Sequence, residues 1–184
     1  MTRSSHHIEP QGALQIARHY VRDLVYGAND GIITTFAVVA GVSGGGLSLR
    51  VVLIIGAANL FADGLSMGVG DYLSIRAHES VLEAQQLPEE EASPVRHGFA
   101  TFAAFVLAGV LPLVPFMIPQ LPLDRFALSI VSTLLALFVV GASRALIANV
   151  TWWRGGLEML TLGAFVAAAA YYSGAGVAAI LSAG

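Results

Sequence analysis

The chain has 184 residues, of which 56% are hydrophobic and 11% are charged, and its formal net charge is −3 at pH 7. Soluble domains carry about 25% charged residues, so this composition indicates a protein whose solvent is a lipid bilayer. The small charge and the lack of a basic tract argue against nucleic acid as a partner. Cysteine is absent, so any metal would have to be held by oxygen, imidazole or thioether groups.

Five apolar stretches follow one another along the chain, and each is long enough to cross about 30 Å of hydrocarbon as a helix. Turn residues or charged residues separate them. The sequence therefore predicts an all-α integral membrane protein with a single domain over residues 1–184. The predicted spans are 24–42, 50–75, 98–118, 126–150 and 157–182, and the predicted segments outside the membrane are 1–22 and 76–97.

The distribution of arginine predicts how the chain is oriented. Cytoplasmic loops of membrane proteins carry an excess of lysine and arginine. The chain has no lysine, and if the N-terminus is cytoplasmic, seven of its nine arginines lie on or near that side, with only Arg50 and Arg125 facing the other side. We therefore expect the N-terminus and segments 1–22 and 76–97 in the cytoplasm and the C-terminus outside.

The second span carries the most informative polar residues. In a helix, Asn59, Asp63, Met67 and Asp71 recur every four residues and lie along one stripe. A carboxylate near the bilayer centre costs at least ~2.5–3.5 kcal/mol, so it usually faces protein or water and indicates an ion path. Asp63 in this span and Asp30 in the first span are the candidates.

Each of these carboxylates also has a structural interpretation. Asp30 could cap a broken helix or bond to Thr34, which follows it at i+4. Asp63 could be a protonated packing group. Asp71 lies close to the predicted cytoplasmic interface, where exposure costs little.

Met67 and Asn59 are open to the same two interpretations. A methionine in an apolar helix is often a packing residue. One turn from Asp63, however, its sulfur lies beside hard oxygens, and this mixture suits first-row transition metals better than magnesium or calcium. Asn59 could offer a carbonyl oxygen to the metal or form a hydrogen bond between helices.

Glycines at four-residue spacing in the first two spans predict close helix packing. Gly27 and Gly31 lie on the first span, and Gly64 and Gly68 lie on the second. Small residues at this spacing let the backbones of membrane helices approach closely. We expect the two spans to pack together through these faces.

The predicted cytoplasmic segments hold all five histidines and many of the acidic residues. Glu79 and Glu83, at i and i+4 beside His78, are the most ligand-like of them. These groups could collect metal ions, or they could form an ordinary solvated surface. Glu158, near the start of the fifth span, could cap that helix through its dipole. The histidines are at positions 6, 7, 19, 78 and 97.

Two strings of residues resemble the vacuolar iron transporter family. Residues 22–35 (RDLVYGANDGIITT) resemble its first span, and residues 58–74 (ANLFADGLSMGVGDYLS) resemble its second-span signature, in the branch common among bacteria. The resemblance implies a five-helix homodimer that moves Fe²⁺, and often Mn²⁺, out of the cytosol in exchange for protons, with the ion path between subunits. It also implies that Asp30 and Met67 take part in translocation.

The chain departs from the vacuolar members of that family at two places. Asn59 stands where those members carry a glutamate, and Asp63 one turn later would supply the missing carboxylate. Segment 76–97 stands where they carry a long glutamate-rich cytosolic domain, so the resemblance does not extend to metal storage or regulation by that domain.

We therefore predict a transporter that takes Fe²⁺ or Mn²⁺ as substrate and has no permanently bound cofactor. The metal would enter past Glu79 and Glu83, lose water against Asp71 and be held by Asp30 and its partners in the second span. The expected partners are divalent metal ions, protons, the lipid bilayer and a second copy of the chain, in a bacterial cytoplasmic membrane. The full predicted metal-binding set is Asp30, Asn59, Asp63, Met67, Asp71, Glu79 and Glu83.

Two other functions fit parts of the same sequence. A non-transporting membrane metal sensor or assembly scaffold would use the glycine-rich spans only for association. A carrier of organic cations would favour aromatic residues around Asp63, and its span offers only Phe61 and Tyr72. An enzyme is not expected, because no nucleophile with a histidine and an acid near it lies within a span.

Overall fold

The computed structural model of the chain describes residues 12–91, 93–147 and 151–183. The regular elements of the described residues are helices, as the sequence predicts, and five of them are long and apolar enough to cross a membrane. In chain order the elements are α1 Ala13–His19, α2 Val21–Gly44, α3 Leu49–Ala84, α4 Pro94–Gly109, the 3-10 helix η1 Leu111–Leu113, α5 Val114–Met117, α6 Arg125–Ile147 and α7 Trp152–Ala183.

The five candidate spans confirm the five predicted ones. They are α2, α3, the stretch Pro94–Met117 that joins α4 to α5, most of α6 and most of α7. Residues 148–150, the end of the fourth predicted span, lie outside the described residues. Prolines explain why the third span is interrupted, because Pro112 and Pro115 cannot continue an α-helical hydrogen-bond ladder after Gly109.

The predicted segment 76–97 is helical over much of its length. Helix α3 continues nine residues beyond the predicted end of its span, to Ala84, and α4 begins at Pro94. No glycine or proline stands between Arg76 and Ala84, so nothing in this polar stretch breaks the helix. The chain turns only after it, where Gln86 has a positive φ of 59°. The connection between α3 and α4 therefore spans only residues 85–93.

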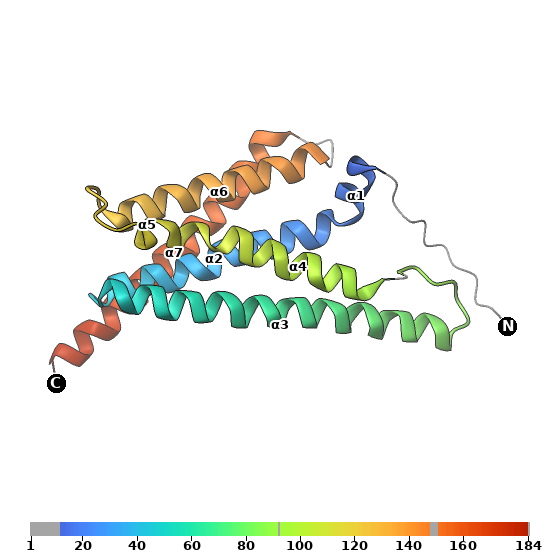
Figure 1. Cartoon of the computed structure of the whole chain (residues 1–184), viewed down its shortest axis with the longest axis horizontal. Coiled ribbons are helices and arrows are strands. Elements are labelled where there is room, and N and C mark those ends of the chain that lie inside the picture. The colour runs from blue at the N-terminus through green and yellow to red at the C-terminus, as the bar shows by residue number, and fades with distance from the viewer. Residues whose placement is uncertain (1–11, 92, 148–150, 184) are drawn as a thin grey trace.

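The bundle has two distinct ends (Figure 1). Helix α1, the α3–α4 connection, the end of α6 and the start of α7 lie at one end, and the α2–α3 turn, α5 and the end of α7 lie at the other. Arg50 and Arg125, at the starts of α3 and α6, lie at the second end. The grouping of arginines thus follows the predicted pattern, and the assignment of the first end to the cytoplasm stays a prediction.

Helix α4 is the element against which the glycine faces of α2 and α3 pack. A Cβ atom at Gly109 of α4 would lie 2.6 Å from the backbone oxygen of Gly31 in α2. A Cβ atom at Gly68 of α3 would lie 2.6 Å from the backbone oxygen of Gly98 in α4. The predicted packing of the two faces on each other is therefore wrong, because α4 takes both of them.

The core lies where these three helices meet. The side chain of Phe105 in α4 is completely buried, and Phe36 of α2 and Leu60 of α3 belong to the same buried cluster. Met67 packs against this cluster from α3. Met67, a predicted metal ligand, therefore also contacts the hydrophobic core.

Candidate functional site

Asp30 and Asp63 lie half-buried on neighbouring helices. Helix α2 runs through Asp30 without a break, so the interpretation of Asp30 as the cap of a broken helix is wrong. The hydroxyl of Thr34 donates to the main-chain oxygen of Asp30 at 2.8 Å, not to its carboxylate. The carboxylates of Asp30 and Asp63 are near enough to interact electrostatically. The fold thus brings the two predicted carboxylates together within one chain.

The rest of the predicted stripe follows the same edge of α3. Asn59, Asp63 and Met67 are all half-buried, because α3 is a continuous helix and the residues recur at its period. Leu60, Gly64 and Gly68, each one residue further along, form the buried face. A soft sulfur, an amide oxygen and a carboxylate therefore lie along one margin between the core and the outer surface, and their role as metal ligands stays a prediction.

Asp71 connects α3 to α4. Its carboxylate accepts a hydrogen bond of 2.8 Å from the hydroxyl of Thr101, which is completely buried. It also interacts electrostatically with Asp23 in α2. Asp71 therefore has a structural bond, and in addition it extends the row of carboxyl groups from Asp63 toward the α1 end of the bundle.

Glu79 and Glu83 line a hollow of about 380 Å³ on that end, together with Glu89 and Glu91. One carboxylate oxygen of Glu79 accepts the backbone N–H groups of Glu90 at 3.0 Å and of Glu91 at 2.8 Å. Glu79 thus fixes the α3–α4 connection against α3. Glu83 is exposed. The predicted acidic pair, Glu79 and Glu83, therefore lies in one hollow, and Glu79 also stabilises the α3–α4 connection.

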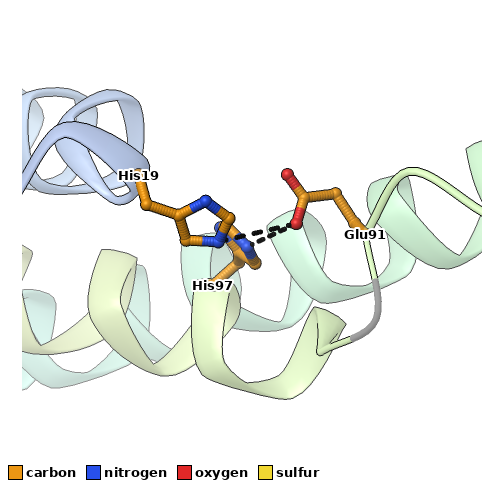
Figure 2. Close-up of side chains that lie close together, drawn as sticks. All are labelled: His19, Glu91 and His97. Carbon is orange, nitrogen blue, oxygen red and sulfur yellow. Dashed lines mark hydrogen bonds and ion pairs between the residues drawn. The ribbon is translucent and has the colours of Figure 1, made fainter. Parts of the chain in front are cut away.

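A cluster at the α1 end of the bundle includes Asp23, to which the sequence had assigned no role. Asp23, in the first turn of α2, is 2.5 Å from Nδ1 of His97, and both side chains are buried. Nε2 of His97 is 3.0 Å from Glu91, and Nε2 of His19 is 3.7 Å from the same carboxylate oxygen (Figure 2). His97 and Asp23 are 74 residues apart in the chain, so no local spacing could have predicted their contact.

The predicted metal-collecting face of five histidines is realised only in part. His19 and His97 come together, with ring centroids 5.0 Å apart. His78 is exposed and pairs with Glu90 at 3.2 Å. His6 and His7 lie outside the described residues. Two of the histidines therefore share a site, and a third lies apart from it.

Glu158 does not cap a helix. It lies six residues after Trp152, the first residue of α7, and pairs with Arg144 of α6 at 2.8 Å. The predicted dipole cap is wrong because α7 begins earlier than the predicted fifth span. Glu158 therefore links α6 to α7.

Hydrophobic helices that can cross a bilayer five times, with half-buried acidic side chains on two of them, define a multi-pass α-helical membrane protein. A family model described as the VIT family matches residues 21–91 and 81–175. Since these matches include most of the chain, the protein belongs to the VIT family. The two matches overlap at 81–91, around the start of the α3–α4 connection.

Individual relatives agree with this membership. Vacuolar iron transporter 1 of Arabidopsis thaliana is 28% identical over 227 aligned residues, which include 92% of this chain and 90% of the relative. Vacuolar iron transporter 1 of Eucalyptus grandis is 26% identical over 84% of this chain and 85% of its own. A vacuolar iron transporter of Toxoplasma gondii is 48% identical over 71 residues, 39% of this chain and 24% of its own. The resemblance deduced from the sequence is confirmed.

Proposed function

We propose that the protein transports Fe²⁺ and Mn²⁺ out of the cytosol in exchange for protons. Relatives that align with most of the chain are named iron transporters. The observation that carries the proposal is that Asp30 and Asp63 are half-buried carboxylates on α2 and α3, two membrane helices that contact each other. Carboxylates in a membrane span are costly and typically belong to an ion or proton path.

The donor set explains the choice of ion. Asp30 and Asp63 supply hard oxygen, Met67 supplies soft sulfur, and Asn59 and Asp71 extend the set along α3. Such a mixture favours first-row transition metals over magnesium and calcium, which bind all-oxygen sites. Carboxylates that hold the cation when ionised can hold a proton after it leaves, and this exchange couples metal flux to a proton gradient without ATP.

The proposal includes a homodimer in a bacterial cytoplasmic membrane, with the N-terminus of each chain in the cytoplasm. The outer side of α3 is exposed and apolar, with Phe61, Leu65 and Val69 each more than half exposed. A second copy seated along this side would place another Asp63 and Met67 near the first pair. Two-fold symmetry would then double each ligand. In this scheme the metal is substrate and no cofactor is bound permanently.

The test is metal flux into proteoliposomes that contain the Asp30→Asn variant. This change keeps the size of the side chain and removes its charge. Without the Asp30 carboxylate, part of the positive charge of the metal ion is left unbalanced within the membrane. An unbalanced charge there costs at least ~2.5–3.5 kcal/mol, so we expect the Fe²⁺ and Mn²⁺ rates to fall about 100-fold or more. The matched control is Asn29→Ala, which changes the adjacent residue in a hollow lined by Arg144 and Glu158. Flux of Asp30→Asn equal to that of the control would overturn the proposal.

The same vesicles test the coupling and the rival function. Under antiport, an acidic lumen accelerates metal entry, and a protonophore removes the acceleration. A gradient that leaves the rate unchanged contradicts antiport. A parent protein that binds metal but shows no flux under any gradient supports the non-transporting sensor or scaffold instead.

A further inference from the structure

We propose that His19, Glu91 and His97 form a second site for a divalent first-row transition-metal ion, separate from the one between α2 and α3. One ligand atom from each residue lies within 4.8 Å of the other two. The three side chains come from α1, the α3–α4 connection and the first turn of α4, and they point toward one another (Figure 2). Segments distant in the sequence thus converge on one point.

The distances between the donor atoms suit a metal. Ligands bound at about 2.0–2.2 Å in tetrahedral or octahedral geometry lie about 3–3.6 Å from one another. The two separations from the Glu91 carboxylate oxygen are near this range, 3.0 Å to His97 Nε2 and 3.7 Å to His19 Nε2, and all three donor atoms lie within 4.8 Å of one another. Two imidazoles with one carboxylate, and room for water or a fourth ligand, are the donor set of known zinc and non-haem iron sites.

Asp23 contacts His97 at the ring nitrogen that does not face Glu91. Its carboxylate is 2.5 Å from Nδ1 of His97, and the two side chains are 1% and 2% exposed. A carboxylate at one ring nitrogen fixes the tautomer and directs the lone pair of the other nitrogen toward the metal. The ring of Tyr20 packs against both imidazoles, with centroid distances of 4.8 Å to each. Asp23 and Tyr20 therefore position the ligands without binding the ion themselves.

Charge balance also favours a divalent cation. Ionised Asp23 and Glu91 carry two negative charges, and neutral His19 and His97 carry none. Arg22 lies 3.4 Å from Asp23, and its side chain is 70% exposed. A divalent ion would neutralise the cluster, and the rival is a network of ion pairs with protonated histidines. His19 and Glu91 are 20% and 29% exposed, so an ion can reach them from solvent.

The position suggests a loading site for transport, and this role rests on the proposed function, whereas metal binding itself does not. Asp23 and Asp30 are seven residues apart on one face of α2, about 10 Å along its axis. Asp71 interacts electrostatically with Asp23 and bonds to Thr101, one turn beyond His97. Polar groups therefore lead from the cluster toward the half-buried carboxylates.

The test is a Co²⁺ titration of the full-length protein in detergent, read by visible absorption and equilibrium dialysis. The Asp30→Asn background removes the contribution of the proposed transport site. We expect one Co²⁺ per chain at the cluster, and an affinity at least about tenfold weaker in His19→Ala and in Glu91→Gln. The matched control is His78→Ala, which removes an exposed histidine with a carboxylate partner and should leave Co²⁺ binding unchanged.

The outcomes are decisive for this site alone. Equal Co²⁺ binding in His19→Ala, Glu91→Gln and the His78→Ala control, or no Co²⁺ bound, would show an ion-pair network and overturn the proposal. His19 and Glu91 are partly exposed, so their variants should fold, and size-exclusion chromatography checks this. Because flux is not measured, failure of the transport proposal would leave this result standing, and the reverse also holds.

Discussion

The two sets of polar groups in this protein are built in opposite ways. Asp30, Asp63 and Met67 lie on two long helices, at positions given by the helical period, and are half-buried along the edge of α3. The cluster of His19, Glu91 and His97 comes from three segments and is backed by a buried carboxylate. Within each helix the first set follows from the helical period, whereas the second set depends on how the end of the bundle is assembled.

The largest expected effect belongs to the set between α2 and α3. In Asp63→Asn, we expect metal flux to fall about 100-fold at saturating metal, because one charge that offsets the buried cation is lost. Proteoliposome uptake at several metal concentrations measures it. Ser66→Ala, an exposed change on the same helix, is the control, and an equal maximal rate in both variants would remove Asp63 from the ion path.

A smaller effect of another kind is expected at the cluster. If it loads the transporter, His19→Ala should raise the metal concentration for half-maximal flux by about tenfold or more and leave the maximal rate unchanged, since losing even a group that only orients a ligand weakens metal sites by about 10–100-fold. The same uptake curves give both numbers. A lower maximal rate with an unchanged half-saturation point would contradict the contrast between loading and translocation.

The smallest effect tests the bond that joins the two regions. Thr101→Val keeps the shape of a completely buried residue but removes its hydrogen bond to Asp71. A lost hydrogen bond to a charged group costs about 1.5–3 kcal/mol, so the variant should unfold at a lower temperature in detergent. Thermal unfolding followed by circular dichroism measures the change, and Ser132→Ala, whose partly buried hydroxyl bonds one turn back along its own helix, serves as the reference.

The sequence predicted what short-range patterns determine. Five apolar runs gave the five spans, and four-residue spacing gave the half-buried stripe on α3. Beyond the predicted span, which ends at residue 75, α3 continues through a polar stretch because nothing in it breaks a helix. The helix continues to Ala84 for that reason.

The spacing of residues along the sequence could not predict contacts between distant segments. The glycines of α2 and α3 correctly predicted close helix packing. They did not predict the packing partner, α4, because a glycine face can pack against any helix that approaches it closely. Asp23 lies in residues 22–35, which resemble the first span of the family, but the sequence assigned it no function. Its contact with His97 depends on the fold bringing residues 74 positions apart into one buried pair.

The location of bound metal tests the central claim most directly. Crystals of the protein soaked in Co²⁺, with an anomalous difference map collected at the cobalt edge, show every ordered site at once. Among the peaks we predict one that is bonded to Asp30 and Asp63, with Met67 beside it. A map with ordered cobalt elsewhere in the protein and none at Asp30 would contradict the assignment of these carboxylates to the ion path.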